Sequence, residues 1–186
     1  MATLLATSSV ILLLALFVVQ LCCDLLTVQF ERVEQLVGGD TMNAKKLRIR
    51  KYNRTVSVLN GTLEILRDLN DDFSFTIDLA YSPLGNKQFI NSPFHIPRQE
   101  ACQFFNTTYR NYRESYRNMT NFPDAGVCPI PAMQYYIDNM ELTADLVNDY
   151  AKSGLWKITF EMFEKDISSP IFVGELLCKI SRDTML

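Results

Sequence analysis

Three segments of this chain alternate apolar and polar residues, and this pattern limits the possible folds more than any other feature. In residues 73–81 every second side chain is apolar, and residues 156–162 and 172–180 repeat the pattern, with an interruption at Gly174. Successive side chains of a strand point to opposite faces, so the pattern is typical of antiparallel sheets that bury one face. The chain is therefore expected to fold mainly as antiparallel β-structure.

Shorter strands are predicted at residues 27–36, 46–52, 55–66 and 134–141. The dipeptide Asn60-Gly61 falls inside the third of these and allows two interpretations. It is either the turn of a hairpin or a bulge within one long strand. We favour the bulge.

Residues 97–117 depart from the alternation and have the spacing of an amphipathic helix. One face of this helix would gather Ala101, Phe104, Phe105, Tyr109, Tyr112 and Tyr116. The opposite face would carry Asn106, Arg110, Arg113 and Arg117. Pro97 suits the first helical turn, where its missing N–H costs nothing. The three arginines predict a solvated helix face, with contact to anionic headgroups as the alternative.

Short strands with one amphipathic helix predict an antiparallel β-sandwich or β-cup, with the helix across an edge or mouth. The interior of such a fold is either filled by side chains or parted to hold an apolar ligand. The apolar strand faces are rich in aromatic residues, which form either a filled core or the wall of a ligand pocket. Its candidate lining residues are Phe73, Phe75, Ile77, Phe89, Trp156, Ile158 and Phe160.

The first 23 residues carry no charged side chain, and residues 10–19 form an apolar run. Such a run has the length of a secretory h-region, roughly 7–15 residues. We predict that residues 1–23 are a cleaved signal peptide and residues 24–186 a single domain. The alternative is an uncleaved signal-anchor helix. Four sequons, at Asn53, Asn60, Asn106 and Asn118, add the prediction of a secreted, extracellular glycoprotein.

The cysteines that follow this segment are Cys102, Cys128 and Cys178. In an oxidising compartment Cys102 and Cys128 are the expected pair. Closing that loop would stabilise the fold by roughly 3 kcal/mol. Cys178 falls on the apolar side of its alternating segment and is expected to be buried and reduced. Its alternatives are pairing with Cys22 or Cys23, if cleavage falls earlier, or an intermolecular disulfide.

The composition argues against an enzyme. His95 is the only histidine, so any Ser–His or Cys–His mechanism would depend on that imidazole, which is expected in a loop or edge strand. The sequence has no G-x-S-x-G, P-loop, C-x-x-C or H-E-x-x-H motif, and no cofactor or metal is expected. Asp68, Asp71 and Asp72 lack the spacing of an EF-hand and predict a solvated turn. The net charge of −3 provides no global basic field for nucleic acid.

Several short blocks carry a family resemblance. They read R-K-Y-N-R-T at 50–55, V-L-N-G-T at 58–62, A-C-Q-F at 101–104, N-F-P at 121–123, C-P-I-P at 128–131 and G-L-W-K at 154–157. Together they resemble a large insect family of small secreted proteins of unknown function, related to the CheB-type chemosensory proteins. The resemblance extends over residues 25–180.

This resemblance implies a fold like the ML lipid-recognition domains and the ganglioside activator protein, a β-cup with an apolar interior. It also implies binding of a lipid or other apolar small molecule without catalysis, and for some members a role in contact chemoreception. The alternative function is a glycoprotein interaction module with a filled core, which binds a receptor or another secreted protein. An enclosed apolar cavity of about 300 Å³ or more would favour the carrier, and a close-packed interior would favour the interaction module.

Overall fold

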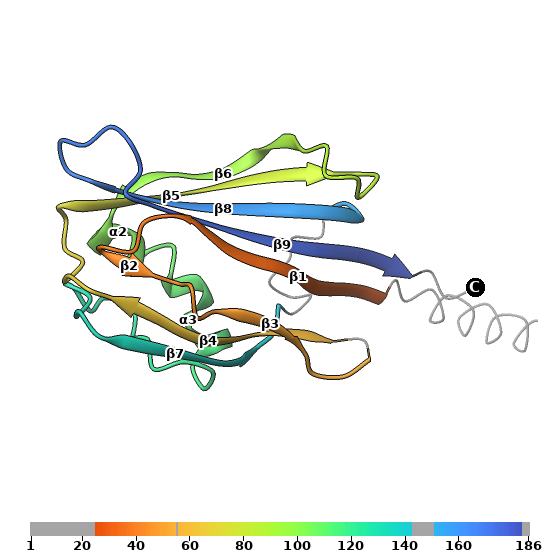
Figure 1. Ribbon diagram of the computed structural model, residues 1–186, viewed down its shortest axis with the longest axis horizontal. Coiled ribbons are helices and arrows are strands. Elements are labelled where there is room, and N and C mark those ends of the chain that lie inside the picture. Colours follow the sequence, from red (N-terminus) through yellow and green to blue (C-terminus); the bar gives the residue numbers. More distant parts are fainter. Residues whose placement is uncertain (1–24, 55, 143–150, 184–186) are drawn as a thin grey trace, which may run out of the picture.

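The computed structural model describes residues 25–54, 56–142 and 151–183, and it shows two antiparallel sheets stacked as layers (Figure 1). The larger sheet has the order β1-β9-β8-β5-β6. The second sheet is built around β4, which pairs with β2 and β3 along one side and with β7. The prediction of a mainly β, antiparallel sandwich or cup is therefore confirmed. The predicted signal peptide, with Cys22 and Cys23, lies outside the described residues.

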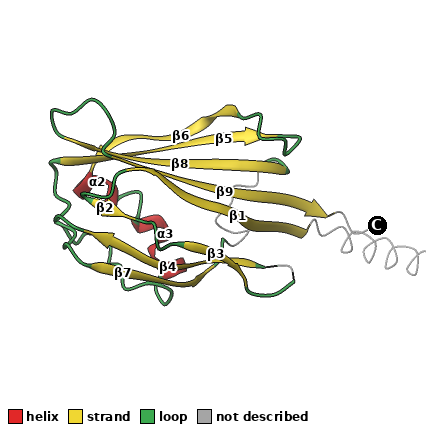
Figure 2. Cartoon of the chain, in the orientation of Figure 1, coloured by secondary structure: helices red, strands yellow, loops and turns green. Residues whose placement is uncertain are grey.

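The larger sheet comprises β1 (Leu25–Val37), β5 (Phe73–Ser82), β6 (Ile90–Glu100), β8 (Gly154–Glu164) and β9 (Phe172–Asp183). The second sheet comprises β2 (Met42–Asn43), β3 (Arg48–Lys51), β4 (Ser57–Ile65) and β7 (Gln134–Met140). Two short helices, α2 (Ala101–Asn106) and α3 (Arg110–Tyr116), complete the described elements (Figure 2). Neither helix is long and apolar enough to cross a membrane, a finding that covers the described residues only.

The three alternating segments are β5, β8 and β9. They are adjacent in the larger sheet, with β8 between β9 and β5. Their registers align the apolar residues into rows that cross the sheet. One row runs from β5 to β1 through Tyr81, Trp156, Cys178 and Phe30. Residues paired across neighbouring strands share a face, so these rows form one apolar wall that faces the second sheet. The shorter predicted strands are confirmed as β1, β3, β4 and β7, with ends shifted by a few residues.

The Asn60-Gly61 dipeptide forms a bulge, as predicted, and not a hairpin turn. β4 continues through it, and its pairing with β7 changes register between Leu59 and Gly61. Gly61 has a φ of +131°, and a Cβ there would lie 2.2 Å from the carbonyl oxygen of Lys46. Only glycine fits this close approach of two backbones.

The prediction of one helix over residues 97–117 is wrong at both its start and its middle. Pro97 lies in β6, an edge strand, where a residue without an N–H leaves no ladder bond unmade. His95 lies on the same strand and is exposed, in agreement with its edge-strand interpretation. The helical segment then breaks after Asn106, where the hydroxyl of Thr107 donates to the carbonyl of Gln103 at 2.7 Å. The backbone N–H of Thr107 still bonds to the same carbonyl, at 2.9 Å. The regular helical pattern ends just after it, where Tyr109 N bonds to Phe104 O, five residues back, at 3.0 Å.

This break changes which residues of the segment face the core. Ala101, Phe104 and Phe105 are buried as predicted, but Tyr112 is exposed. Arg113, predicted on a solvated face, is only 8 % exposed. The turn at residues 107–109 shifts the phase of α3 relative to α2, so a single helical wheel cannot describe both. Arg113 is therefore unavailable to anionic headgroups.

The predicted disulfide is confirmed. Cys102 and Cys128 are bonded with their Cα atoms 5.5 Å apart, and the bond ties α2 to the segment that precedes β7. Beside it, Asp71 accepts a hydrogen bond from the backbone N–H of Cys102 at 3.0 Å. Cys178 is a free, buried thiol on β9, as expected.

Removal of this disulfide should lower stability through the unfolded chain. The double variant Cys102→Ser/Cys128→Ser should lose about 3 kcal/mol of unfolding free energy in urea titrations, because the sequence separation of 26 residues sets the loop entropy. The single variant Cys102→Ser should also lower secreted yield, since Cys128 is left as an unpaired thiol. Cys178→Ala serves as the control that keeps the bond. Equal stability of the double variant and the parent would contradict this account.

Candidate ligand-binding cavity

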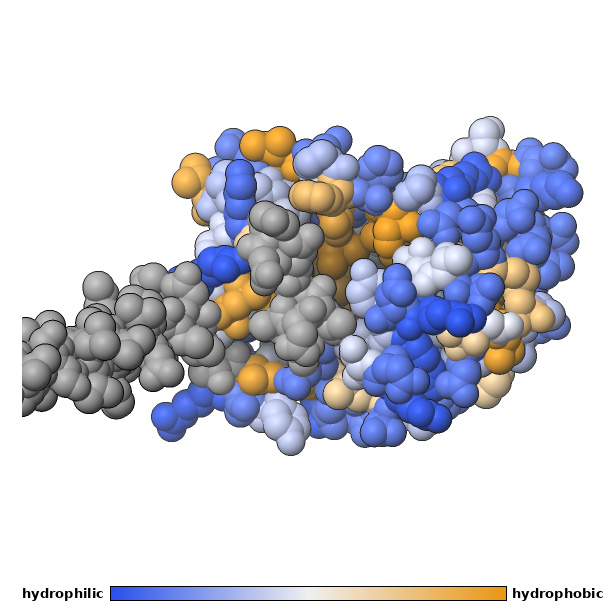
Figure 3. Space-filling model, turned by 180° about the vertical axis from the view of Figure 1, so that it is seen from behind, coloured by the Kyte–Doolittle hydropathy of each residue, from blue (hydrophilic) through white to orange (hydrophobic). Residues whose placement is uncertain are grey.

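A cavity of 390 Å³ lies between the two sheets. Figure 3 shows an apolar recess between the two layers on the face opposite the view of Figure 1. The larger sheet lines the cavity with Val33, Phe75, Ile77, Ile158, Phe160 and Leu176. The second sheet supplies Leu59, Leu63, Ile65, Ile137 and Met140. The helical segment and its flank close one side with Phe104, Phe105, Tyr109, Tyr116 and Phe122.

The cavity divides the apolar interior into two clusters. The larger cluster includes Phe75 and Phe104, and the smaller is centred on Phe30, Leu47 and Cys178. Residues of both clusters line the cavity. The space is partly open, because it reaches the surface at the recess in Figure 3, and it is not an enclosed packing void.

Gly174 makes part of this room. It lies on β9 between Phe172 and Leu176, and in the neighbouring strand it pairs with Phe160. Its position lines the cavity, where the alternation of β9 would otherwise place a large apolar side chain. A Cβ at Gly174 would lie 3.2 Å from the ring of Phe172, so a larger side chain needs only a small shift of that ring.

Aromatic rings form the firmest part of the wall. The ring of Phe75 lies 5.2 Å from Phe160, 5.3 Å from Phe104 and 5.6 Å from Phe105, between ring centroids. The series continues from Phe105 to Phe122 at 5.7 Å. Such tilted and edge-on pairs are worth about 0.5–1.5 kcal/mol each beyond their burial. They hold this side of the cavity in a defined shape.

The polar groups at the cavity are few and mostly engaged. Glu34 and Glu175 are register partners in β1 and β9 and alternate with the cavity-lining Val33 and Leu176. Their carboxylates therefore lie on the outer face of the sheet, where they pair with Arg32 and Lys157. The hydroxyl of Tyr109 donates to Pro123 O at 3.1 Å. The hydroxyl of Thr120 likewise donates a hydrogen bond to Tyr136 O at 2.6 Å. Tyr116 also lines the cavity, and its hydroxyl makes no hydrogen bond to any residue that the structure describes.

The structure brings four of the seven candidate pocket residues to this cavity: Phe75, Ile77, Ile158 and Phe160. The other three lie elsewhere. Phe73 belongs to the larger cluster, with the guanidinium of Arg67 5.0 Å from its ring centroid. Trp156 packs in the smaller cluster and stacks on Tyr81 at 4.9 Å. Phe89 lies against Lys157, whose side chain alternates with the cavity-lining Ile158 and so faces away from it.

The second sheet and the helical flank supply wall residues that the sequence analysis did not single out. Leu59, Leu63 and Ile65 lie on β4, whose composition already indicated a strand. These aliphatic residues lie outside the aromatic-rich strands for which a pocket was predicted. Phe122 follows no periodic segment, so only its place beside the N-F-P block could have indicated it.

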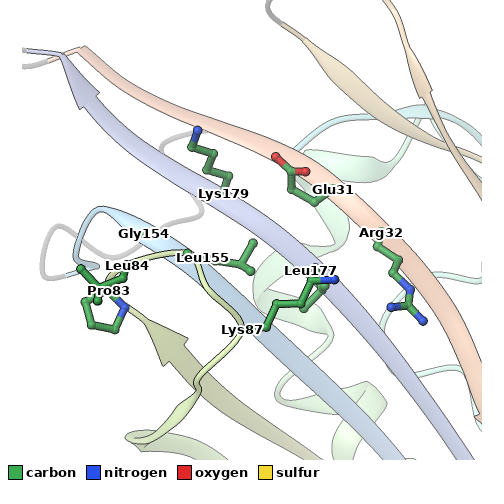
Figure 4. Close-up of a pocket in the computed structure, with 10 residues that line it drawn as sticks. Glu31, Arg32, Pro83, Leu84, Lys87, Gly154, Leu155, Leu177 and Lys179 are labelled. Atoms are coloured by element: carbon green, nitrogen blue, oxygen red, sulfur yellow. The ribbon is translucent and has the colours of Figure 1, made fainter.

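A second hollow lies on the outer side of the larger sheet. Figure 4 shows Glu31 and Arg32 on β1 and Lys179 on β9, with Lys87 on the loop between β5 and β6. It has a volume of 540 Å³ and is lined by both acidic and basic residues. Its apolar floor, which includes Leu177, is smaller than the apolar wall of the interior cavity. This hollow lacks the continuous apolar wall of the interior cavity.

The acidic residues of the turn between β4 and β5 have structural partners. Asp68 accepts a hydrogen bond from Ala132 N at 2.7 Å, and Asp71 accepts the bond from Cys102 N already described. Within residues 25–54, 56–142 and 151–183, no group of three or more His, Cys, Asp or Glu is placed to hold a metal ion. The turn therefore fixes the chain segments around the disulfide.

A local basic stretch was missed because the whole chain is acidic. Residues 45–54 read K-K-L-R-I-R-K-Y-N-R and contain no acidic residue. The basic side chains of this stretch are all exposed, around β3 and the turn that follows it. Charged residues on a border strand disfavour pairing with other sheets.

The central part of the chain is similar to a known protein family. Residues 75–158 match a family described as "Protein of unknown function (DUF1091)". The matched region begins at Phe75 and ends at Ile158, and it includes both disulfide cysteines. No curated protein matches the chain. The chain is thus similar to an uncharacterised family over β5 to β8.

Burial of Cys178 should make the protein less stable at high pH. Desolvation raises the pKa of this thiol from 9.0 to about 12, and burial likewise raises the pKa of Tyr109 and Tyr116 from 10.0 to about 12. The unfolded chain therefore releases these protons first, so stability is complete below pH 9 and falls as pH rises toward 12.

Thermal unfolding between pH 7 and pH 11 measures this effect. The melting temperature should fall above pH 9, and Cys178→Ala should fall less between pH 9 and pH 10. In the folded protein at pH 8, the thiol should not react with a disulfide reagent until guanidinium unfolds the chain. Rapid reaction of the folded protein would show that Cys178 is not buried.

Proposed function

We propose that this protein is secreted and binds a lipid or another apolar small molecule without catalysing a reaction. The observation that carries the proposal is the 390 Å³ cavity between the sheets, with walls that are apolar almost throughout. Pockets for small molecules have volumes of about 300–1,000 Å³ and mostly apolar linings. This space favours the carrier over the alternative of an interaction module with a filled core.

Two further features support the setting of this function. The Cys102–Cys128 disulfide is typical of proteins that fold in an oxidising compartment. An apolar interior between two antiparallel sheets also agrees with the resemblance to ML lipid-recognition domains. Within the resembled insect family, such a carrier would suit the capture of apolar molecules in contact chemoreception.

Uptake of an uncharged fluorescent probe tests the proposal directly. The purified protein should bind N-phenyl-1-naphthylamine with micromolar affinity, because burial of apolar area supplies ~25 cal/mol per Å² before the costs of binding. Gly174→Leu should fill the cavity and weaken probe binding at least tenfold. Native mass spectrometry of the secreted protein should show a co-purified lipid that Gly174→Leu lacks.

Thr159→Leu is the matched control, since it adds a similar side chain to the same sheet on the face opposite Ile158. It should bind the probe like the parent. Absence of probe uptake by the parent, together with absence of any co-purified lipid, would remove the proposal. Equal binding by Gly174→Leu would show that the probe sits outside this cavity.

The basic stretch at residues 45–54 favours a second function, the binding of an acidic protein partner at the surface. Lys45, Lys51 and Arg54 are exposed, and their side chains form no hydrogen bond or ion pair with another described residue. Charge complementarity of this kind speeds association and sets partner choice. Binding at this surface does not depend on the cavity, so Gly174→Leu should leave it unchanged and thereby separate the two functions.

Glycosylation, which the sequons predict, should be uneven among the four sites. Asn53, Asn106 and Asn118 are exposed. Asn60 lies within β4, and its side-chain amide donates to Asp138 at 3.1 Å. Peptide mapping after enzymatic release of glycans should find modification at the three exposed sites and none at Asn60. A glycan on Asn60 with the exposed sites bare would contradict this assignment.

A further inference from the structure

The charges around the cavity restrict the chemistry of its ligand. Among the described residues, no lysine, arginine or histidine lines the cavity. The two charged lining residues, Glu34 and Glu175, are acidic and already paired with Arg32 and Lys157. Residues 143–150 also contain no basic residue in the sequence. A ligand carboxylate that entered this space would find no counter-charge.

Arg113 is a buried cation on α3, and its guanidinium contacts the turn at residues 122–124. Its guanidinium donates to Phe122 O at 3.0 Å and to Pro123 O at 3.2 Å, and it lies 3.3 Å from a carboxylate oxygen of Asp124. Arg113 is not among the residues that line the cavity. Its Nη1 atom is buried and has no hydrogen-bond partner among the described residues. The other two guanidinium nitrogens hold the turn that carries Phe122.

The volume of the cavity limits how much of a ligand it can hold. A methylene group needs roughly the volume of one water molecule in the liquid, about 30 Å³. The 390 Å³ cavity therefore accommodates about 13 groups of this size. Its lining reaches from Phe104 and Tyr109 in one cluster to Leu47 and Met140 beside the other, so a linear chain can follow the gap between the clusters.

One hydroxyl remains for a polar end of the ligand. Tyr109 and Thr120 use their hydroxyls to bind backbone carbonyls, whereas Tyr116 has no such partner among the described residues. Burial raises the pKa of Tyr116 to about 12, so its hydroxyl stays protonated at neutral pH. It can donate one hydrogen bond to an alcohol or ester oxygen.

We propose that the cavity selects an uncharged chain of about a dozen carbon atoms, with one alcohol or ester oxygen placed at Tyr116, over a carboxylate of the same length. This inference rests on the proposed function, because it concerns the ligand of the same cavity. Burial of an unpaired carboxylate is strongly unfavourable, so a fatty acid enters only in its protonated form.

Displacement of N-phenyl-1-naphthylamine at pH 5 and pH 8 tests the selection. 1-Dodecanol should displace the probe equally at both pH values, which also shows that the protein stays folded. Dodecanoic acid should lose at least a hundredfold in apparent affinity at pH 8, because each pH unit above a carboxyl pKa of roughly 4–5 removes tenfold of the neutral form. Equal displacement by the acid and the alcohol at pH 8 would overturn the selection while leaving the proposed function intact.

The role of Tyr116 needs a separate variant. Tyr116→Phe should weaken 1-dodecanol about fivefold to tenfold, the worth of one hydrogen bond, and leave dodecane unchanged. Tyr52→Phe is the matched control, because this exposed tyrosine undergoes the same chemical change at a position that does not line the cavity. Unchanged affinity for the alcohol in Tyr116→Phe would overturn the assignment of the polar end. If neither dodecanol nor dodecane displaced the probe, the proposed function itself would fail.

Discussion

The aromatic contacts around Phe75 set the distance between the two sheets on which the cavity depends. Phe75 projects from β5 and meets Phe104, Phe105 and Phe160 at centroid distances of 5.2–5.6 Å. Phe122 extends this group and reaches Tyr135 of the second sheet at 4.5 Å. Rings are incompressible spacers as well as apolar contacts. They join the layers at this side and keep them from closing further.

The opposite side of the sandwich is joined by hydrogen bonds instead of rings. The hydroxyl of Ser57 on β4 donates to Phe30 O of β1 at 2.7 Å, and the side chain of Gln35 on β1 accepts a bond from Ala44 N at 2.7 Å. These short links bring β1 down onto the second sheet. Layers tied closely along one side and spaced by aromatic residues along the other leave a gap between them. The disulfide at Cys102 then fixes the aromatic side, since α2 carries both Phe104 and Phe105.

The sequence predicted those parts of the fold that depend on local periodicity. The strands β5, β8 and β9 each bury one face, and their alternation therefore predicted them. Helical spacing across residues 97–117 was misleading, because Thr107 ends α2 and no periodicity in apolar residues records that break. β6 was missed for a related reason: two prolines weaken its strand pattern, yet an edge strand tolerates them.

The cavity wall was only half predictable from the sequence. The strand faces of Phe75, Ile77, Ile158 and Phe160 follow from alternation, which fixes the face of every residue once a strand is known. Alternation does not reveal which sheet lies opposite or how far away it stands. Leu59 and Leu63 therefore gave no separate signal, and Trp156 and Phe73 had the same pattern as the wall residues although they pack in the clusters on either side.

Gly174 breaks the alternating pattern of β9 at the wall of the cavity. The alternation of β9 calls for a large apolar side chain at this position, and such a side chain would fill part of the gap and join the two clusters. Glycine instead weakens the strand and leaves apolar walls without partners, both of which cost stability. Its φ lies outside the left-handed region, so backbone conformation does not require glycine here. Departures from local rules tend to mark functional sites, and this departure has its largest effect on the space between the sheets.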